Sequence, residues 1–349
     1  MSTLTLDPAF LEAGPEVIDA VLADVLGEPV LIVVPAEGHA SSLGRAPGLL
    51  ALRRRPVLTV GVDAAPGIAG AFDLTIPASE LPRVQAAFAR APITAVTAAL
   101  LVRTPPVDVW TGLVAESTTY SMLQAGPEFA AWLASRAGRP APTADPTPRV
   151  RSQTDGRVSE VVLTRPRKHN ALDPRLRDEL DALLAEIAAQ PGAIIVRAEG
   201  PSFCSGGDLD TFGSFPDPAT AHGVRLARSL AWRFAQLAPR LVVGLHGACL
   251  GAGIELPAFA GIVVAADDAR IGLPELGLGL VPGAGGTVSI PRRAGSARLL
   301  DLLLRDDTIG AQTALEWGLV DEVVSRAERE GRCAVLARDR ARDRDGGPL

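Results

Sequence analysis

The sequence predicts an α/β protein with a parallel β-sheet, because strand-like and helix-like segments alternate along its second half. The best-defined helix covers residues 173–190, where Asp173 can cap the first turn, Pro174 occupies the first helical position and leucines recur at helical spacing. Parallel neighbours need crossover connections, which the intervening helices supply. The predicted strands are 159–164, 193–200, 240–247 and 261–268, and a further helix is predicted over 218–238.

The clearest boundary is the segment AGRPAPTADPTPRVR, residues 137–151, which contains four prolines and no apolar periodicity. This composition is typical of a linker. It divides the chain into a smaller N-terminal α/β domain of unknown role (1–140), a Pro-rich linker (141–151) and a C-terminal domain (152–349).

The N-terminal part has its own strand and helix patterns, and Glu116 and Tyr120 fall on one helical face, which predicts a structural or interfacial role. Segment 55–80 repeats, in shortened form, the order of segment 239–268. Two interpretations remain: a degenerate duplicate of the C-terminal domain, or chance similarity between two strand–loop–strand units rich in Ala and Gly. The predicted strands here are 28–36, 55–63 and 72–78, and the predicted helices are 80–91 and 117–136.

Composition limits the possible partners. The 34 basic and 40 acidic side chains give a net charge of −6, without the clustered Lys and Arg that neutralise nucleic-acid phosphates. The three cysteines, Cys204, Cys249 and Cys333, lack CxxC spacing, and the four histidines lack metal-ligand spacing. The N-terminus lacks the basic region of a signal peptide, and no apolar run reaches about 20 residues. We therefore expect a soluble cytoplasmic protein with no metal site, no nucleic-acid partner and no membrane partner.

Three glycine-rich stretches, 203–212, 247–256 and 273–286, each follow a predicted strand. In a parallel sheet such loops meet in one crevice, where ligands bind. Glycines let a ligand approach the backbone, and the first amides of a helix have no partner within it. The backbone N–H groups of Ser205 and Ala252 are therefore the predicted oxyanion hole, which would stabilise charge on a carbonyl oxygen.

Two carboxylates, Glu255 and Glu275, stand in these stretches among small and apolar residues. Facing one crevice, they could share a water molecule, one taking its proton while the other supplies a proton to carbon. A dry pocket would raise the pKa of at least one of them. The alternative is that each carboxylate only stabilises the start of a helix through its dipole.

Four segments, LTRPRKHNALD, FCSGGDL, HGACLGAGIELPAFAGIVVAADDARIGLPELGLGLVPGAGGT and TALEWGLVDEVV, occur in that order. Over residues 152–326 the chain resembles the enoyl-CoA hydratase/isomerase (crotonase) superfamily. The resemblance implies a ββα-superhelix, an acyl-CoA substrate that brings its own CoA, no other cofactor, and a homotrimer or hexamer. It also implies that Glu255 and Glu275 perform syn hydration of a 2-enoyl thioester, which the N–H groups of Ser205 and Ala252 hold.

The resemblance further implies two sets of binding residues. The predicted CoA-binding residues are Arg165, Arg167, Lys168, Asn170, Ala171, Leu172, Gly206, Gly207 and Asp208, with the three basic side chains on the phosphates. The predicted pocket residues are Phe203, Gly251, Gly253, Pro282 and Gly283. Bracing of the 205–212 loop is the alternative role for Asp208.

Other functions on this scaffold stay open. Ala252 stands where hydratases of the family usually have glycine, and the sequence after Val324 is short where relatives use C-terminal helices to complete the acyl pocket and trimer contacts. Double-bond isomerisation is one alternative, although isomerases often work with a single carboxylate. A non-catalytic acyl-CoA-binding protein is the other.

Overall fold

The largest β-sheet of the protein has six strands in the order β13-β10-β8-β7-β6-β5. All neighbours are parallel except the hairpin β5–β6, so helices connect them. Strand β8, with the sequence LVVGL, is buried along its whole length because both faces of the sheet are covered. The strands are β5 (Val150–Asp155), β6 (Val158–Leu163), β7 (Ala193–Ala198), β8 (Leu241–Leu245), β10 (Ile262–Ala266) and β13 (Glu322–Val324). This computed structural model describes residues 2–12, 14–25, 27–36, 46–136 and 146–343.

A second sheet, in the order β12-β11-β9, takes up the chain directly after two strands of the first. Strand β9 follows β8 and leads into helix α12, and β11 follows β10 and leads into α13. The chain therefore repeats a strand–strand–helix unit, which confirms the predicted ββα-superhelix in the C-terminal part. The strands of this sheet are β9 (Ala248–Leu250), β11 (Arg270–Gly272) and β12 (Ile309–Gly310).

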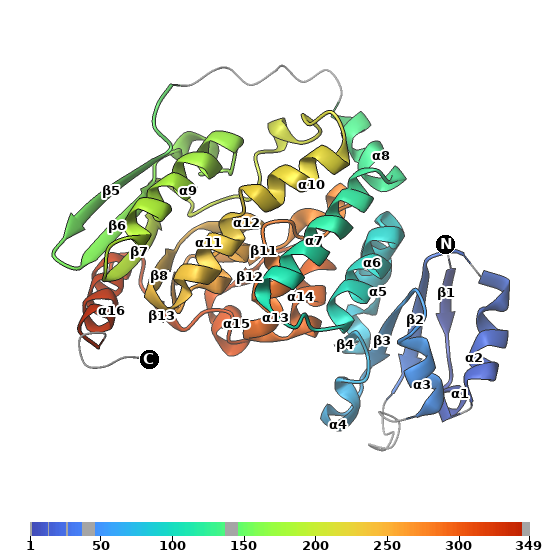
Figure 1. Cartoon of the computed structure of the whole chain (residues 1–349). Coiled ribbons are helices and arrows are strands. Elements are labelled where there is room, and N and C mark those ends of the chain that lie inside the picture. The colour runs from blue at the N-terminus through green and yellow to red at the C-terminus, as the bar shows by residue number, and fades with distance from the viewer. Residues whose placement is uncertain (1, 13, 26, 37–45, 137–145, 344–349) are drawn as a thin grey trace.

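Helices cover the faces of these sheets (Figure 1). The single helix predicted over 218–238 is wrong, because the chain leaves helical geometry at Arg228 and Ser229 then caps a new helix by accepting the Trp232 N–H. The helices of this part are α9 (Pro174–Ala188), α10 (Pro218–Ala227), α11 (Leu230–Leu237), α12 (Ala252–Glu255), α13 (Gly286–Ala294), α14 (Ser296–Leu303), α15 (Ala311–Glu316) and α16 (Arg329–Asp343).

The N-terminal sheet is four-stranded and parallel in the order β1-β2-β3-β4, and it lies at one end of the molecule (Figure 1). Its strands are β1 (Ser2–Thr5), β2 (Val30–Pro35), β3 (Val57–Val62) and β4 (Leu74–Ile76), with helices α1 (Pro8–Glu12), α2 (Pro15–Leu22), α3 (Pro47–Leu52) and α4 (Pro66–Ala69). The order β3–α4–β4 corresponds to β8–β9–α12–β10 without a counterpart of β9, and both outer strand pairs are parallel. That the N-terminal part is a shortened duplicate stays a prediction.

Helices α5 (Leu81–Arg90), α6 (Pro92–Arg103), α7 (Val109–Gln124) and α8 (Pro127–Ser135) lie between that sheet and the C-terminal part (Figure 1). The single helix predicted over 117–136 is wrong at its start and in its continuity: Asp108 caps the true start by accepting the Thr111 N–H, and the chain turns at Gly126 before α8, which ends at Ser135. No single described helix is long and apolar enough to cross a membrane. The segments Ala78–Arg90 and Pro92–Arg103 reach that length only when taken together, and the chain bends by 106° between them.

Packing does not follow the predicted division at residue 140. Side chains of α5–α8, such as Phe88 and Leu113, belong to one continuous core with residues of the C-terminal sheets, whereas β1, α1, α2 and α3 surround a separate small core. Arg83 of α5 adds polar contacts, donating to Asp301 at 2.9 Å and to the carbonyl of Leu304 at 2.8 Å. Strand β5 begins at Val150, so the predicted linker 141–151 is too long at its end; residues 141–145 lie outside the described residues.

Candidate active site

Two of the glycine-rich stretches lie directly against each other. Cys204 and Cys249 form an isolated parallel bridge, and the Leu250 N–H donates to the Cys204 carbonyl at 3.0 Å. A Cβ on Gly253 would lie 2.1 Å from the Cys204 oxygen, and one on Gly206, whose φ is +93°, would lie 3.0 Å from the Leu250 oxygen. Glycine is therefore required at both positions for the two loops to meet.

The predicted role of the Ser205 amide is contradicted by the structure. The Ser205 N–H donates to the His169 carbonyl at 3.0 Å and so is not available to a substrate. The carbonyl of the following residue, Gly206, accepts the Leu172 N–H at 2.8 Å. It therefore faces the same segment, 169–172, as the Ser205 N–H does. Because the C=O and N–H of one trans peptide point in opposite directions, the Gly207 N–H points to the other side, toward Leu250.

The amides of Gly207 and Ala252 donate to no backbone or side-chain group in the described parts of the chain. Ala252 is the first residue of α12, as predicted for a helix opening there, and its N–H has no partner within the helix. The two free amides come from adjacent loops. The register of the Leu172–Gly207 bridge, which the sequence did not reveal, decides which residue of FCSGGDL can contribute.

Glu255 ends α12 and is almost completely buried. Its Oε2 accepts the N–H groups of Ala284 at 2.7 Å and Gly286 at 2.9 Å. These amides stand at the N-terminus of α13, where the helix dipole favours negative charge. A Cβ on Gly286 would lie 2.7 Å from Glu255 Cγ, so a side chain there would displace the carboxylate.

Glu275 lies in the short 3₁₀ helix Pro274–Leu278, beside the loop that precedes α12. Its Oε1 would be 2.3 Å from a Cβ on Gly251, whose φ of +48° already favours glycine. Its other oxygen, Oε2, is buried and has no hydrogen-bond partner among the described residues. An ionised carboxylate without donors is unfavourable in such a place, so the protonated form is preferred.

The two carboxylates therefore have opposite surroundings. Burial, with added repulsion from Glu116, raises the pKa of Glu275 to about 8. Burial and repulsion from Glu275 and Glu116 raise the pKa of Glu255 well above its usual value, although its two amide donors oppose that rise by stabilising the charged form. Burial thus favours a proton on either carboxyl, and their hydrogen bonds distinguish them: two amides stabilise a negative charge on Glu255, whereas Glu275 Oε2 has no donor among the described residues.

A third buried carboxylate, Glu116 of α7, reaches the same backbone from the N-terminal part of the chain. Its Oε1 accepts the Gly285 N–H at 2.7 Å, and its Oε2 accepts the Thr287 N–H at 2.9 Å and hydroxyl at 2.7 Å. Burial raises the pKa of Glu116 to about 7. Four consecutive amides, from 284 to 287, thus donate alternately to Glu255 and Glu116. Glu116 was predicted to be structural or interfacial, and its link to Glu255 was missed.

The predicted CoA contacts fall into two groups. Arg165 is not available for phosphate: it is nearly buried, forms ion pairs with Asp208 at 2.7 Å and Asp173 at 3.3 Å, and donates to the Ala171 carbonyl. Asp208 consequently braces its loop, and its Oδ1 also accepts the Asp210 N–H. By contrast Arg167 and Lys168 are exposed, and among the described residues the ion-pair partner of Lys168 is Asp210.

Asn170 holds this loop in shape. It is fully buried with a φ of +52°, accepts the Arg165 N–H through Oδ1, and donates through Nδ2 to the carbonyls of Glu199 and Ser202. Its side chain is therefore used inside the protein. Ala171 is buried beside it, and Leu172 reaches a neighbouring cavity.

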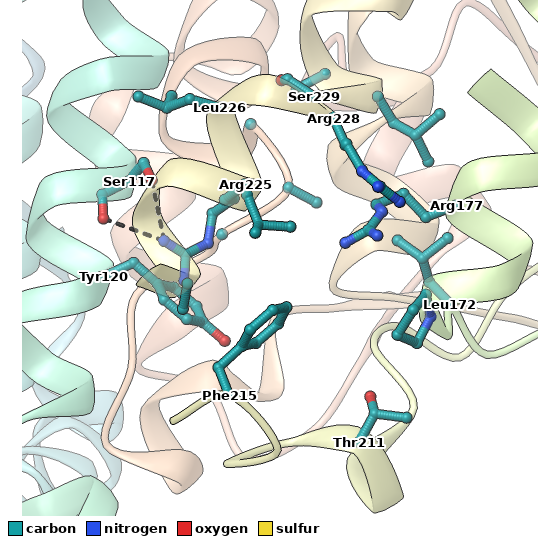
Figure 2. A pocket seen from close by; sticks show the side chains of 18 of the residues that line it. Ser117, Tyr120, Leu172, Arg177, Thr211, Phe215, Arg225, Leu226, Arg228 and Ser229 are labelled. Atoms are coloured by element: carbon teal, nitrogen blue, oxygen red, sulfur yellow. Dashed lines mark hydrogen bonds between the residues drawn. The ribbon is translucent and has the colours of Figure 1, made fainter. Parts of the chain in front are cut away.

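That cavity has a volume of about 210 Å³, and Tyr120, Phe215 and Arg225 are among its lining residues (Figure 2). Leu256, next to Glu255, forms part of its wall, as do residues 283–285, whose backbone Glu255 and Glu116 hold. Helix α7 supplies another part of the wall, and Phe212 and Phe215 a third. Among the predicted pocket residues, Gly283 lines this cavity, while Phe203 faces a separate void of about 20 Å³ that Ala252 also lines. Gly251, Gly253 and Pro282 line neither cavity.

Comparison with known proteins agrees with this geometry. The sequence model described as "Enoyl-CoA hydratase/isomerase" matches residues 153–342, just over half of the chain. The chain belongs to the enoyl-CoA hydratase/isomerase family.

This chain aligns with about two thirds of the length of curated members of the enoyl-CoA hydratase/isomerase family. A protein of Bacillus subtilis named "Probable enoyl-CoA hydratase" is 36% identical over 175 residues, which are 46% of this chain and 66% of that protein. The carnitinyl-CoA dehydratase of Proteus mirabilis is 33% identical over 178 residues, covering 50% and 67% of the two chains.

Solved structures of the enoyl-CoA hydratase/isomerase family share the fold of the C-terminal part. The enoyl-CoA hydratase of Thermoplasma volcanium superposes with a TM-score of 0.50 at 31% identity, covering 55% of this chain and 78% of that one. A Thermobifida fusca structure in complex with CoA superposes with a TM-score of 0.51 at 30% identity, covering 57% of this chain and 82% of that one. Helix α7, which supplies Glu116, lies outside the residues that the family model matches.

Proposed function

We propose that the protein catalyses reversible syn hydration of a 2-enoyl-CoA thioester. The observation that carries this proposal is the pair of buried carboxylates with opposite hydrogen-bond surroundings: Glu255 accepts two amides, whereas Glu275 Oε2 accepts none. Hydration needs one group that takes a proton from water and one that gives a proton to the α-carbon. Glu255 takes the first role and Glu275 the second.

The thioester oxygen is held by the N–H groups of Gly207 and Ala252, so Gly207 replaces Ser205 in the oxyanion hole. These donors have no other acceptor among the described residues and therefore need no rearrangement when charge develops on the oxygen. Each such donor typically lowers the activation free energy of the reaction by about 3–4 kcal/mol. The extra methyl group of Ala252 is buried and does not remove its N–H.

The names of the relatives support a reaction on an acyl-CoA thioester. Both the hydratase name of the Bacillus subtilis relative and the dehydratase name of the Proteus mirabilis relative describe addition or removal of water, and the Thermobifida fusca structure holds CoA. CoA enters as part of the substrate, so we propose no separate cofactor and no metal. A cytoplasmic location and a homotrimer or hexamer belong to the same proposal.

The experiment follows the absorbance of the conjugated thioester while purified protein is mixed with a panel of aliphatic and aromatic 2-enoyl-CoAs. We expect Glu255→Gln and Glu275→Gln each to lower kcat by about 10²- to 10⁴-fold, the usual contribution of a positioned acid or base. Glu186→Gln, at an exposed position of α9, is the control and should keep wild-type activity.

CoA-thioester binding by each variant is measured beside the rate. Loss of turnover with binding retained supports hydration. Wild-type protein that binds the whole panel but adds water to no member would contradict it. Formation of a shifted double bond without hydrated product would instead identify an isomerase.

A further inference from the structure

Three arginines, Arg177, Arg225 and Arg228, line the cavity beside the carboxylates, and two of them already have an anionic partner (Figure 2). Arg177 and Arg228 both form ion pairs with Asp178, one with each of its oxygens. These two guanidinium groups therefore have their charge balanced at the rim of the cavity. Arg225, on α10, differs from them.

Arg225 forms no ion pair with any carboxylate of the described residues, although its guanidinium is largely removed from solvent. Its Nη1 donates to the Ser117 hydroxyl at 2.9 Å and the Ser121 hydroxyl at 3.1 Å, and its Nη2 donates to Gln124 Oε1 at 3.0 Å. All these acceptors are neutral. Glu116 attracts the guanidinium through space but forms no hydrogen bond or ion pair with it among the described residues, and its oxygens accept from Gly285 and Thr287 instead.

Several donors remain free on this wall. Arg225 Nε and the second N–H of Nη2 have no acceptor among the described residues. The guanidinium lies over the Tyr120 ring at 4.3 Å from its centre, and Figure 2 shows the tyrosine hydroxyl turned toward the cavity and Phe215. Burial raises the pKa of Tyr120, so that hydroxyl keeps its proton and can donate it.

The wall is placed where the far end of an acyl chain would lie. Tyr120 packs on Gly283, since a Cβ there would be 2.5 Å from its ring. Gly283 and its neighbours also line the cavity and carry the amides that hold Glu255. A chain whose thioester is at Gly207 and Ala252 therefore passes the two carboxylates before it reaches Arg225.

We propose that the preferred substrate is a 2-enoyl-CoA whose acyl chain ends in a carboxylate, received by Arg225 and Tyr120. This inference rests on the proposed function for its reaction, but its binding step is independent of turnover. A carboxylate would balance the unpaired guanidinium and accept its free N–H groups, as charge-assisted hydrogen bonds require. A chain ending in a methyl group would leave the buried donors without acceptors, which a binding site penalises strongly.

The first test is binding of two saturated thioesters of equal carbon number, glutaryl-CoA and pentanoyl-CoA, measured by titration calorimetry. We expect the protein to bind glutaryl-CoA at least tenfold more tightly. Arg225→Met should abolish that preference and Arg225→Lys should keep part of it, because the lysine retains the charge without the fork of donors. Arg233→Met, at an arginine of α11 that pairs with Asp181 outside the cavity, is the control and should keep the preference.

The outcomes are distinguishable. Equal affinity for both ligands, or tighter binding of pentanoyl-CoA, would overturn the inference. So would an Arg225→Met variant that melts at the wild-type temperature and keeps the glutaryl-CoA preference. A variant that fails to fold leaves Arg225→Lys and the wild-type comparison to decide.

The second test compares the hydration of trans-glutaconyl-CoA with that of trans-2-pentenoyl-CoA. A higher kcat/KM for glutaconyl-CoA, lost in Arg225→Met, supports both proposals. Preferential binding of glutaryl-CoA without hydration of either enoyl thioester would contradict the hydratase and leave the carboxylate site standing. Hydration of both substrates at equal rates, together with equal binding of the two saturated thioesters, would support the hydratase proposal and contradict the carboxylate-binding role of Arg225 and Tyr120.

Discussion

Gly251 controls how close Glu275 can come to the oxyanion loop. The glycine has a φ of +48°, and the Glu275 Oε1 occupies the space where any side chain would begin. The carboxyl that we propose as the proton donor therefore rests directly on the backbone that precedes Ala252. Within the described residues no hydrogen bond holds Oε2, so packing of the carboxyl against this glycine helps to fix its place.

Replacing Gly251 with alanine should displace Glu275 and lower kcat by at least tenfold, because small misplacements of a catalytic group have large effects. The measurement is the hydration rate with thermal unfolding recorded in parallel. Gly277→Ala, in the same 3₁₀ helix but with open space around it, is the matched control. Unchanged turnover in a folded Gly251→Ala protein would show that Glu275 has no role in the reaction.

Glu116 is linked to Glu255 through the backbone of residues 284–287, whose amides the two carboxylates share. Glu116→Gln would lose an acceptor for Thr287 or Gly285 and should destabilise the protein by about 1–3 kcal/mol. It also removes the repulsion that helps to raise the pKa of Glu275. Since Glu275 must be protonated to act as the acid, we expect the alkaline decline of kcat to move to lower pH.

The measurement is a rate profile from pH 5 to 10 for the variant and the wild type. In the wild type the decline should occur near the Glu275 pKa of about 8. A variant that is less stable but declines at the same pH would show that Glu116 only supports the fold.

Single residues were predictable where one side chain determines the chemistry. An acid among small residues after a strand singled out Glu255 and Glu275, and the structure buries both, while their catalytic role stays a prediction. Ser205 was assigned wrongly because the direction of an amide depends on the register with Leu172, more than thirty residues earlier in the chain. Arg165 was assigned wrongly because its partner Asp208 comes from another loop, and only the fold shows that the pair is buried.

At the scale of elements, α6 is tied to the N-terminal sheet by a buried ion pair. Arg103 donates to Asp73 and to the carbonyls of Arg53 and Arg55. Asp73 in turn accepts the Thr59 amide and hydroxyl at 2.8 Å each. This network joins α6, β3 and the start of β4 at one point.

Arg103→Met should lower the free energy of unfolding by about 3–5 kcal/mol, because Asp73 is left as an unpaired buried charge. Arg55→Met removes an ion pair with Asp19 that is about half exposed on both sides, so its cost should be at most about 1 kcal/mol. Denaturant unfolding of the two variants gives the comparison. Equal losses would mean that burial of the Arg103 pair adds nothing.

The elements themselves were largely readable from apolar periodicity and caps. Strand predictions such as 193–200 and 240–247 agree with β7 and β8 to within two residues at each end. The breaks between α7 and α8 and between α10 and α11 were missed, because Ser229 and Gly126 interrupt segments whose apolar spacing continues on both sides. Periodicity reports which face is buried, whereas caps decide where a helix stops.

At the scale of the molecule, one core passes through both halves of the chain. The sequence predicted an independent N-terminal domain from the proline-rich segment, since composition reveals where a chain lacks periodicity but not which surfaces meet. Helices α5–α8 instead cover the C-terminal part and supply a wall of the cavity.

Cleavage of the chain between residues 137 and 145, at an introduced protease site, should therefore leave both pieces associated and active. The buried apolar surface shared by α5–α8 and the C-terminal sheets holds them together without the covalent link. Size-exclusion chromatography and the hydration rate before and after cleavage provide the measurement. Separation of the fragments with activity retained by residues 146–349 alone would contradict the role assigned to α7.

The hydrogen bond from Gly285 to Glu116 joins residues 169 positions apart. At about 5–20 residues per second, a ribosome needs roughly ten to thirty seconds to synthesise that interval. Throughout this time α7 has been made, while the amides that its glutamate will bind do not yet exist. The nascent chain must therefore keep the apolar side of α5–α8 and the Glu116 carboxylate without their final partners, so formation of the active site is delayed until late in translation.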